Sequence, residues 1–232
     1  FNQWIPKIGL QNTSLGPTNP ERCGHAFDVG NNLHYFVGAA NQSGSAANRV
    51  WTVDSSTWKW TLRPSTGTNP SSGLVNPSVY YHNGFIQVFG GRESNKASYS
   101  SALYEVDVSS GASWTMISPT GTERPLPRGD AGFTMTPSGD AYLYGGELQG
   151  VGTFGDLWYY DETTHDFYPE NPDDFQPQGR SNASGTWADT EGLAYGGVCD
   201  HGVDNGLWRV TYGGGQAFWQ RVEAFGDRPP PL

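Results

Sequence analysis

The sequence repeats a short pattern about every fifty residues. In each copy an apolar segment ends in two small residues, a segment with an aromatic residue and an aspartate follows, and a further aromatic residue comes last. The small pairs begin at Gly38, Gly90, Gly145 and Gly196, so the steps between them are 52, 55 and 51 residues. A fixed period of this length is typical of proteins built from stacked like units. It predicts one continuous array rather than separate domains.

Each repeat reads as four antiparallel strands. In the third copy, residues 131–136 and 141–144 are expected to form the first hairpin, and residues 157–161 and 166–168 the third strand and the outer strand. In the second copy Asn83-Gly84 marks the same first turn, because Asn and Gly tolerate the left-handed backbone that tight hairpins need. One repeat therefore predicts one small sheet, which cannot bury both of its faces alone.

Large aromatic residues recur at two positions of the repeat. One series falls on the third strand and the other on the outer strand, with nearly the same step as the glycine pairs. Such residues fill the wedge between neighbouring sheets, so we interpret them as core rather than as a ligand-stacking site. The two series are Trp51, Tyr104, Trp158 and Trp208, and Trp60, Trp114, Phe167 and Trp219.

The glycine pair, the Leu-Trp/Tyr-x-x-Asp strand and the following Trp together resemble kelch repeats. The resemblance covers almost the entire chain, with Gly38-Ala39 replacing the glycine pair in the first copy. It implies an all-β fold, a kelch-type β-propeller of the galactose-oxidase/kelch-like superfamily. Each repeat would form one four-stranded antiparallel blade, with the first strand innermost and the last outermost. It implies no single activity, since kelch-like propellers serve as adaptors, lectin-like binders and, in some cases, enzymes.

Four complete repeats predict four blades, and fragments of two more flank them. Trp4 lies 56 residues before Trp60 and so fits the outer-strand series. The expected division of the single segment 1–232 is an outer strand of a preceding blade with a linker at 1–21, blades at 22–66, 67–122, 123–176 and 177–225, and the start of a further blade at 226–232.

The extra strand bears on how the propeller closes. One stray strand beside four whole blades does not complete a shared blade, and exposed sheet edges invite pairing with other chains. We therefore expect an arc of a larger six- or seven-bladed ring, with further blades from the rest of the chain or from a partner chain. A closed four-bladed ring with a loose N-terminal strand is the alternative. A Cys23–Cys199 disulfide would require that closed ring, so we expect free or separately paired thiols, with Cys199 the more exposed.

The composition restricts the partners and the location. The formal net charge is −10, so no basic stripe is available for nucleic acid or anionic lipid. No run of about 18 apolar residues is present, and no membrane span is expected. The chain begins at Phe1 without a leader, as expected of a processed fragment. Three sequons, at Asn12, Asn41 and Asn182, together with few lysines, predict a secreted, extracellular glycoprotein.

One face of the disc is the candidate binding surface. It should collect the loops before each first strand and those after each glycine pair, and their mixed charges suit a sugar or an extended peptide. The Arg residues that precede first strands, Arg22, Arg128 and Arg180, match an Arg common in kelch-like repeats, so structural anchoring is the alternative for them. The predicted ligand-binding residues are Arg22, His25, Arg92, Glu93, Asp130, Glu147, Arg180, Asp189, Asp200 and His201.

Metal chemistry is the first alternative to binding. Asp200, His201 and Asp204 crowd one loop beside Cys199 and could hold a divalent ion, but a solvated acidic loop explains them as well. The iron motif Glu-x-x-x-Asp-x-x-x-His of plant specifier proteins, which resemble this pattern, is incomplete here. Asp161 and His165 are spaced correctly, but Leu157 replaces the Glu. We therefore predict no metal and no other cofactor.

Catalysis is equally weakly supported. Tyr80-Tyr81-His82 offers a Tyr-His pair for a copper enzyme, but on the face opposite Cys199. Glu170, Asp173 and Asp174 read as a solvated linker rather than as paired acid and base. The predicted function is a non-catalytic binding or scaffold module with a protein or glycan ligand. The alternative is part of a propeller enzyme, such as a galactose-oxidase-like copper oxidase, whose catalytic residues lie partly outside this segment.

Overall fold

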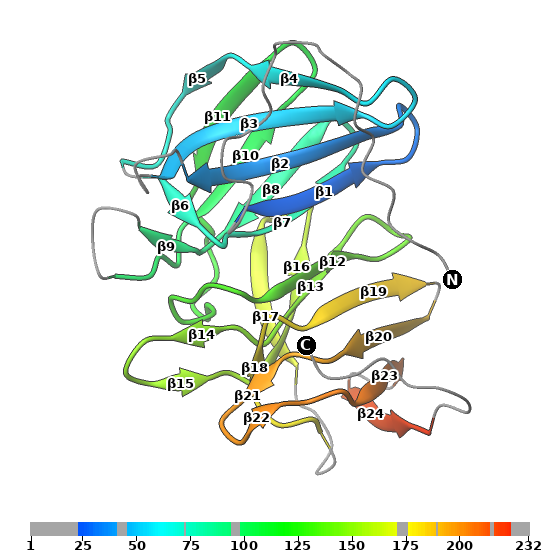
Figure 1. Cartoon of the computed structure of the whole chain (residues 1–232). Coiled ribbons are helices and arrows are strands. Elements are labelled where there is room, and N and C mark those ends of the chain that lie inside the picture. The colour runs from blue at the N-terminus through cyan, green and yellow to red at the C-terminus, as the bar shows by residue number, and fades with distance from the viewer. Residues whose placement is uncertain are drawn as a thin grey trace.

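The structure is a computed structural model of the chain (Figure 1). It describes residues 23–40, 46–71, 73–93, 98–170, 176–188, 190–213 and 216–223. Regular structure in these ranges is entirely β-strand, and none of it is a helix of the length and hydrophobicity needed to cross a membrane. The predicted outer strand around Trp4 and the predicted start of a further blade at 226–232 lie outside the described residues.

Four four-stranded antiparallel units follow one another along the chain (Figure 1). Blade 1 consists of β1 (Gly24–Asp28), β2 (Leu33–Ala40), β3 (Ala46–Asp54) and β4 (Lys59–Arg63). Blade 2 consists of β7 (Ser78–His82), β8 (Phe85–Phe89), β10 (Leu103–Asp107) and β11 (Ala112–Ile117). Blade 3 consists of β12 (Gly132–Met135), β13 (Ala141–Tyr144), β16 (Leu157–Asp161) and β17 (Asp166–Glu170). Blade 4 consists of β19 (Ser184–Ala188), β20 (Glu191–Tyr195), β23 (Leu207–Gly213) and β24 (Gln216–Val222).

The predicted kelch-type β-propeller architecture is confirmed. Within each blade these four strands are hydrogen-bonded in chain order, and the first strands β1, β7, β12 and β19 contact one another in turn. The first strand is therefore innermost. In Figure 1 the described residues form an open arc and not a closed ring. Neither Cys23 nor Cys199 forms a disulfide with a described residue, which agrees with the open arc rather than with the disulfide of a closed four-bladed ring.

The strand boundaries of the third repeat follow the sequence closely. The first three predicted strands agree with β12, β13 and β16 to within one residue at each end. The hairpin turn at Asn83-Gly84 has the left-handed backbone that was predicted, with φ of 48° and 91°. Only β17 differs, because it runs two residues past Tyr168. Glu170, predicted to lie in a solvated linker, is instead the last residue of this outer strand, while Asp173 and Asp174 lie outside the described residues.

Blade 2 has a fifth strand that the repeat pattern does not predict. β5 (Ser65–Gly67) follows β4 directly and pairs in parallel with the outer edge of β11. Gly67 has φ of 79°, and a Cβ at this position would overlap the Trp114 carbonyl group. A glycine therefore allows this close approach, and the chain leaving blade 1 covers the edge of blade 2.

The two sides of the arc differ. Three small sheets project on one side, which we call the loop face (Figure 1). The turns that join the first and second strands lie on the opposite side, which we call the turn face. The small sheets pair β6 (Leu74–Val75) with β9 (Arg92–Glu93), β14 (Glu147–Leu148) with β15 (Gly152–Thr153), and β21 (Val198–Cys199) with both β18 (Arg180–Ser181) and β22 (Gly202–Val203).

The apolar core lies between neighbouring blades. The rings of Tyr144 in blade 3 and Trp219 in blade 4, for example, are 5.0 Å apart. Trp51 and Trp60 remain partly exposed, because they lie on the face of blade 1 that is turned away from blade 2. The members of the two aromatic series that are buried as predicted are Tyr104, Trp114, Phe167, Trp208 and Trp219.

His25 does not line the loop face as predicted. Because β1 begins at Gly24, the alternation of the strand turns Gly24 and Ala26 toward blade 2 and His25 toward the outer face of blade 1. There its Nε2 lies 3.0 Å from Nδ1 of His34, and its ring lies 5.0 Å from that of Phe36. Partial burial and the neighbouring His34 lower the pKa of His25.

Candidate functional site

Two arginines before first strands, Arg128 and Arg180, are structural anchors. Arg128 is completely buried, and its guanidinium donates to the Gly145 carbonyl at 2.9 Å and to both carboxylate oxygens of Asp156. Arg180 is only 2% exposed and donates to the Gly196 carbonyl at 2.9 Å, with Asp204 at 2.9 Å. Arg180 is therefore held inside its blade instead of lining the surface. Arg22 lies outside the described residues.

The glycine pairs of blades 2 and 3 receive the start of the next blade. The N–H of Gly91 donates to the Arg128 carbonyl and that of Gly146 to the Arg180 carbonyl, both at 2.8 Å. Gly145 has φ of 70°, and a Cβ there would lie 2.5 Å from the Arg180 oxygen. The repeat of small pairs thus marks where consecutive blades are joined.

Three residues form a polar ridge on the loop face. Asn76, Asp130 and Asn182 each stand two residues before a first strand and each have a left-handed backbone, with φ of 52°, 58° and 56°. The Asp130 N–H donates to the Asn76 carbonyl at 3.2 Å, and the Asn182 N–H to the Asp130 carbonyl at 2.9 Å. Asn76 Nδ2 also donates to Asp130 Oδ1 at 2.5 Å. The ridge runs without interruption from blade 2 to blade 4.

The polar ridge was only partly visible in the sequence. Asp130 was predicted as a ligand-binding residue and Asn182 as a sequon, whereas Asn76 was missed. The signal that could have revealed Asn76 is its position, because Asn and Asp tolerate a left-handed backbone where the chain turns into a strand. Asn182 is exposed, while the other predicted glycosylation residues, Asn12 and Asn41, lie outside the described residues.

The small sheets carry the other predicted residues beside this ridge. Glu147 accepts a hydrogen bond from Tyr99 Oη at 3.1 Å, and Asp200 accepts one from Thr153 Oγ1 at 3.1 Å. His201 is exposed beside Asp200 in the turn between β21 and β22. Arg92 and Glu93, in β9, are partly exposed, and Asp189 lies outside the described residues. The structure thus brings Arg92, Glu93, Asp130, Glu147, Asp200 and His201 to one face.

Three of the residues considered for metal binding have other partners. Within the described ranges, no group of three His, Cys, Asp or Glu side chains is arranged to hold a metal ion. Asp204 pairs with Arg180, and Asp161 Oδ1 accepts the backbone N–H groups of Thr163 and Thr164 in the turn after β16. His165 Nδ1 lies 2.6 Å from Tyr160 Oη.

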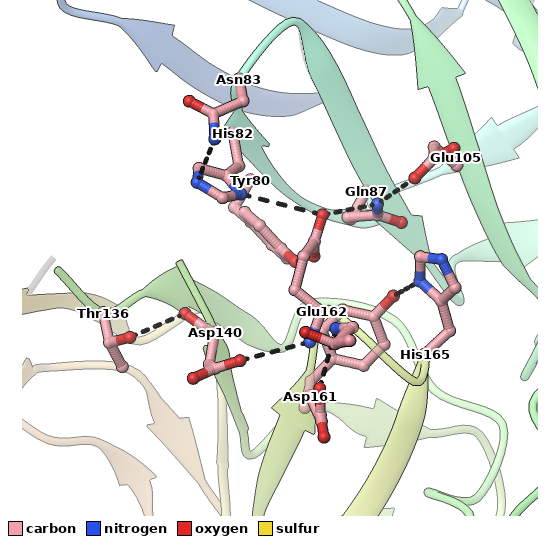
Figure 2. Close-up of polar contacts among 12 residues, drawn as sticks. Tyr80, His82, Asn83, Gln87, Glu105, Thr136, Asp140, Asp161, Glu162 and His165 are labelled. Atoms are coloured by element: carbon pink, nitrogen blue, oxygen red, sulfur yellow. Dashed lines mark hydrogen bonds and ion pairs between the residues drawn. The ribbon is translucent and has the colours of Figure 1, made fainter. Parts of the chain in front are cut away.

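A second polar cluster joins blades 2 and 3 nearer the turn face (Figure 2). Tyr80 donates to Glu162, and Gln87 Nε2 donates to Glu162 at 3.2 Å and to Glu105 at 2.9 Å. Nδ1 of His82 lies 3.9 Å from Glu162. Tyr80 and His82, the pair considered for copper, therefore contact a carboxylate. Burial raises the pKa of Glu162, although the hydrogen bonds from Tyr80 and Gln87 oppose this.

We expect Glu162→Gln to change how stability depends on pH. A carboxyl whose pKa is raised on folding stabilises the fold fully below its unfolded pKa, and this contribution is lost as pH rises through the folded pKa. Glutamine stays neutral and keeps an acceptor for Tyr80. The free energy of unfolding of the variant, relative to that of wild type, should therefore increase as the pH rises above about 4 in urea titrations. The exposed Glu123→Gln serves as control, and a difference independent of pH would contradict the expectation.

Four similar blades arranged in an open arc place this chain among the repeat proteins that form β-propellers. The chain belongs to the kelch-repeat family: the family model described as the KLHDC2/KLHL20/DRC7 Kelch-repeats domain matches residues 77–232. The chain is 24% identical over 254 residues to Kelch domain-containing protein 3 from Rattus norvegicus, and equally to that from Mus musculus. The match covers 97% of this chain but 63% of each relative, so the chain spans less than two thirds of their length. Kelch repeats generally mediate protein binding.

Proposed function

We propose that this chain is a non-catalytic module that binds an extended polypeptide on its loop face. The observation that carries the proposal is the polar ridge of Asn76, Asp130 and Asn182, which crosses three blades with its edge partly exposed. A peptide backbone offers donors and acceptors at regular steps, and a continuous row of amide and carboxylate groups can pair with them. Membership in a family whose repeats generally bind proteins supports a protein ligand over a glycan.

The charges beside the polar ridge would supply specificity. Arg92 and Glu93 lie on the small sheet of blade 2, and Asp200 and His201 on that of blade 4, so both signs border the ridge. Rim charges of this kind select partners and steer association more than they add to affinity. The extracellular location, the glycan ligand and the use of the sequons stay predictions.

The experiment selects peptides from a random display library against the whole chain and measures their affinity for two loop-face variants. We expect Asp200→Arg and His201→Ala to weaken binding, the first by about tenfold, because it reverses a charge at the rim of the site. Thr163→Arg, an exposed position in the β16–β17 turn on the other side of the arc, is the matched control and should change affinity less than about twofold. Peptides whose binding is lost in the control, or binding of glycans alone on an array, would overturn the proposal.

A further inference from the structure

A pocket of about 630 Å³ lies on the turn face between blades 3 and 4. Its lining includes the turn that joins β12 to β13, so it opens on the side opposite the loop face and is separate from the proposed peptide site. The volume is in the range that holds small ligands or a single side chain. The lining residues that matter for its chemistry are Asp140, Tyr142, Tyr159, Glu170, Trp187 and Tyr212.

Four aromatic rings meet in this pocket. Tyr142, from β13, is buried at its base and stacks on Trp187 from β19, with ring centroids 4.3 Å apart and planes 11° apart. Tyr159 and Tyr212 tilt toward the ring of Tyr142 with centroids at 5.6 and 6.1 Å. Tyr212 is 41% exposed, so part of this aromatic surface is open to a ligand.

The pocket also carries uncompensated negative charge. Glu170 accepts a hydrogen bond from Tyr212 Oη at 2.6 Å, and Asp140 Oδ1 accepts one from the Glu162 N–H at 3.3 Å. Among the described lining residues there is no Lys, Arg or His. Burial and the neighbouring Glu170 raise the pKa of Tyr212 to about 12, so this phenol remains neutral near pH 7. Burial also raises the pKa of Glu170, and the hydrogen bond from Tyr212 opposes this.

We propose that this pocket binds an organic cation, an alkylammonium or guanidinium group. Aromatic rings attract cations through their electron-rich faces, and two nearby carboxylates add a Coulomb attraction. An anionic ligand would meet the same charges as repulsion. A chain with a net charge of −10 also draws cations toward it from a distance. The ligand can be a small free cation or a Lys or Arg side chain of a partner protein, which share this chemistry.

The first test is calorimetric titration of the whole chain with defined probes. Tetramethylammonium represents a small free cation, and acetyl-arginine amide and acetyl-lysine amide represent protein side chains. Acetyl-citrulline amide is the neutral analogue of the arginine probe. We expect saturable binding of at least one cation, about fivefold tighter than that of the neutral analogue. It should weaken strongly as ionic strength rises from about 0.1 to 1 M. Tighter binding of tetramethylammonium would indicate a small free cation as the ligand, and tighter binding of an amino-acid amide would indicate a side chain of a partner protein.

The second test compares variants of pocket residues with matched variants on the opposite face of blade 4. Glu170→Gln removes the charge but keeps an acceptor for Tyr212. Its control is Glu191→Gln, because Glu191 lies near Arg209 on the face of blade 4 that is turned away from the pocket. Tyr212→Ala removes an exposed ring, and its control is Phe218→Ala, 42% exposed on that other face.

Each pocket variant should weaken cation binding by about threefold to fivefold, and each control by less than about twofold. Thermal unfolding of all four variants checks that they fold. Equal affinity for acetyl-citrulline amide, or equal losses in Glu170→Gln and Glu191→Gln, would overturn the proposal. So would the absence of cation binding to the folded wild-type chain.

Discussion

Replacing Asp156 with alanine is expected to lower the free energy of unfolding by about 3–5 kcal/mol. Asp156 is the counter-ion of Arg128, whose side chain is completely buried, and it accepts from both terminal nitrogens of the guanidinium at 2.5 and 2.7 Å. Without it, the buried positive charge keeps, among the described residues, the carbonyls of Leu126 and Gly145 and the Phe154 ring, whose centroid lies 4.0 Å from the guanidinium carbon. Urea unfolding followed by far-ultraviolet circular dichroism measures the loss.

A second variant separates the buried charge from the general effect of losing an aspartate. Asp107→Ala removes the partly exposed last residue of β10, whose carboxylate accepts a hydrogen bond from the Ser109 N–H, and we expect it to cost much less than Asp156→Ala. The double variant Asp156→Ala with Arg128→Met should recover part of the loss, because methionine fills the space without a charge. If Asp156→Ala is no worse than Asp107→Ala, water must solvate the guanidinium and the anchoring role of Arg128 is wrong.

The blade pattern could be predicted because it depends on local chemistry repeated at a fixed spacing. Alternating apolar residues define the strands, and a turn such as Asn83-Gly84 sets the register of a hairpin without help from the rest of the chain. The position of β5 could not be predicted in this way. Its residues are short, polar and exposed, and only the open edge of β11 gives them a partner.

The candidate sites depended on which way each side chain points. The sequence left Arg180 open between an anchor and a ligand contact, and burial against Gly196 and Asp204 identifies it as an anchor. His25 was expected on the loop face because it follows the entry to the first strand, but it lies within β1, where the alternation of the strand directs its side chain to the outer face of blade 1.

The turn-face pocket could not be predicted from the sequence. Tyr142 and Tyr212 belong to strands of different blades that are far apart in the chain. Aromatic residues at such positions read as ordinary packing between blades, which they also provide. Glu170 read as part of a polar linker, and only the extension of β17 places its carboxylate beside Tyr212. A site made across a blade interface becomes visible only when both blades are in place.

Replacing Gly145 with alanine is the second change expected to have a large effect, about 3 kcal/mol or more in free energy of unfolding. With φ of 70°, a residue with a Cβ is strained by about 1–2 kcal/mol. The new methyl group would also lie 2.5 Å from the Arg180 carbonyl oxygen, which is backbone and cannot swing aside. Relief of this overlap requires blade 4 to move away from blade 3, which weakens the bond from the Gly146 N–H to the same oxygen.

The matched control is Gly196→Ala, at the same place in blade 4. Its φ of 69° imposes the same backbone strain, but the nearest described atom to an added Cβ is the Asp204 oxygen at 3.5 Å, an ordinary contact. We therefore expect Gly196→Ala to cost only the strain of about 1–2 kcal/mol, and the excess at Gly145 measures how tightly two blades are joined. Equal losses of unfolding free energy in the two variants would have one of two causes. Either the contact between blades 3 and 4 adjusts easily to the added methyl group, or another segment lies against Gly196 as Arg180 lies against Gly145. The size of the loss decides between these, because a small loss at both positions indicates a yielding joint and a large loss at both indicates a further blade seated on blade 4.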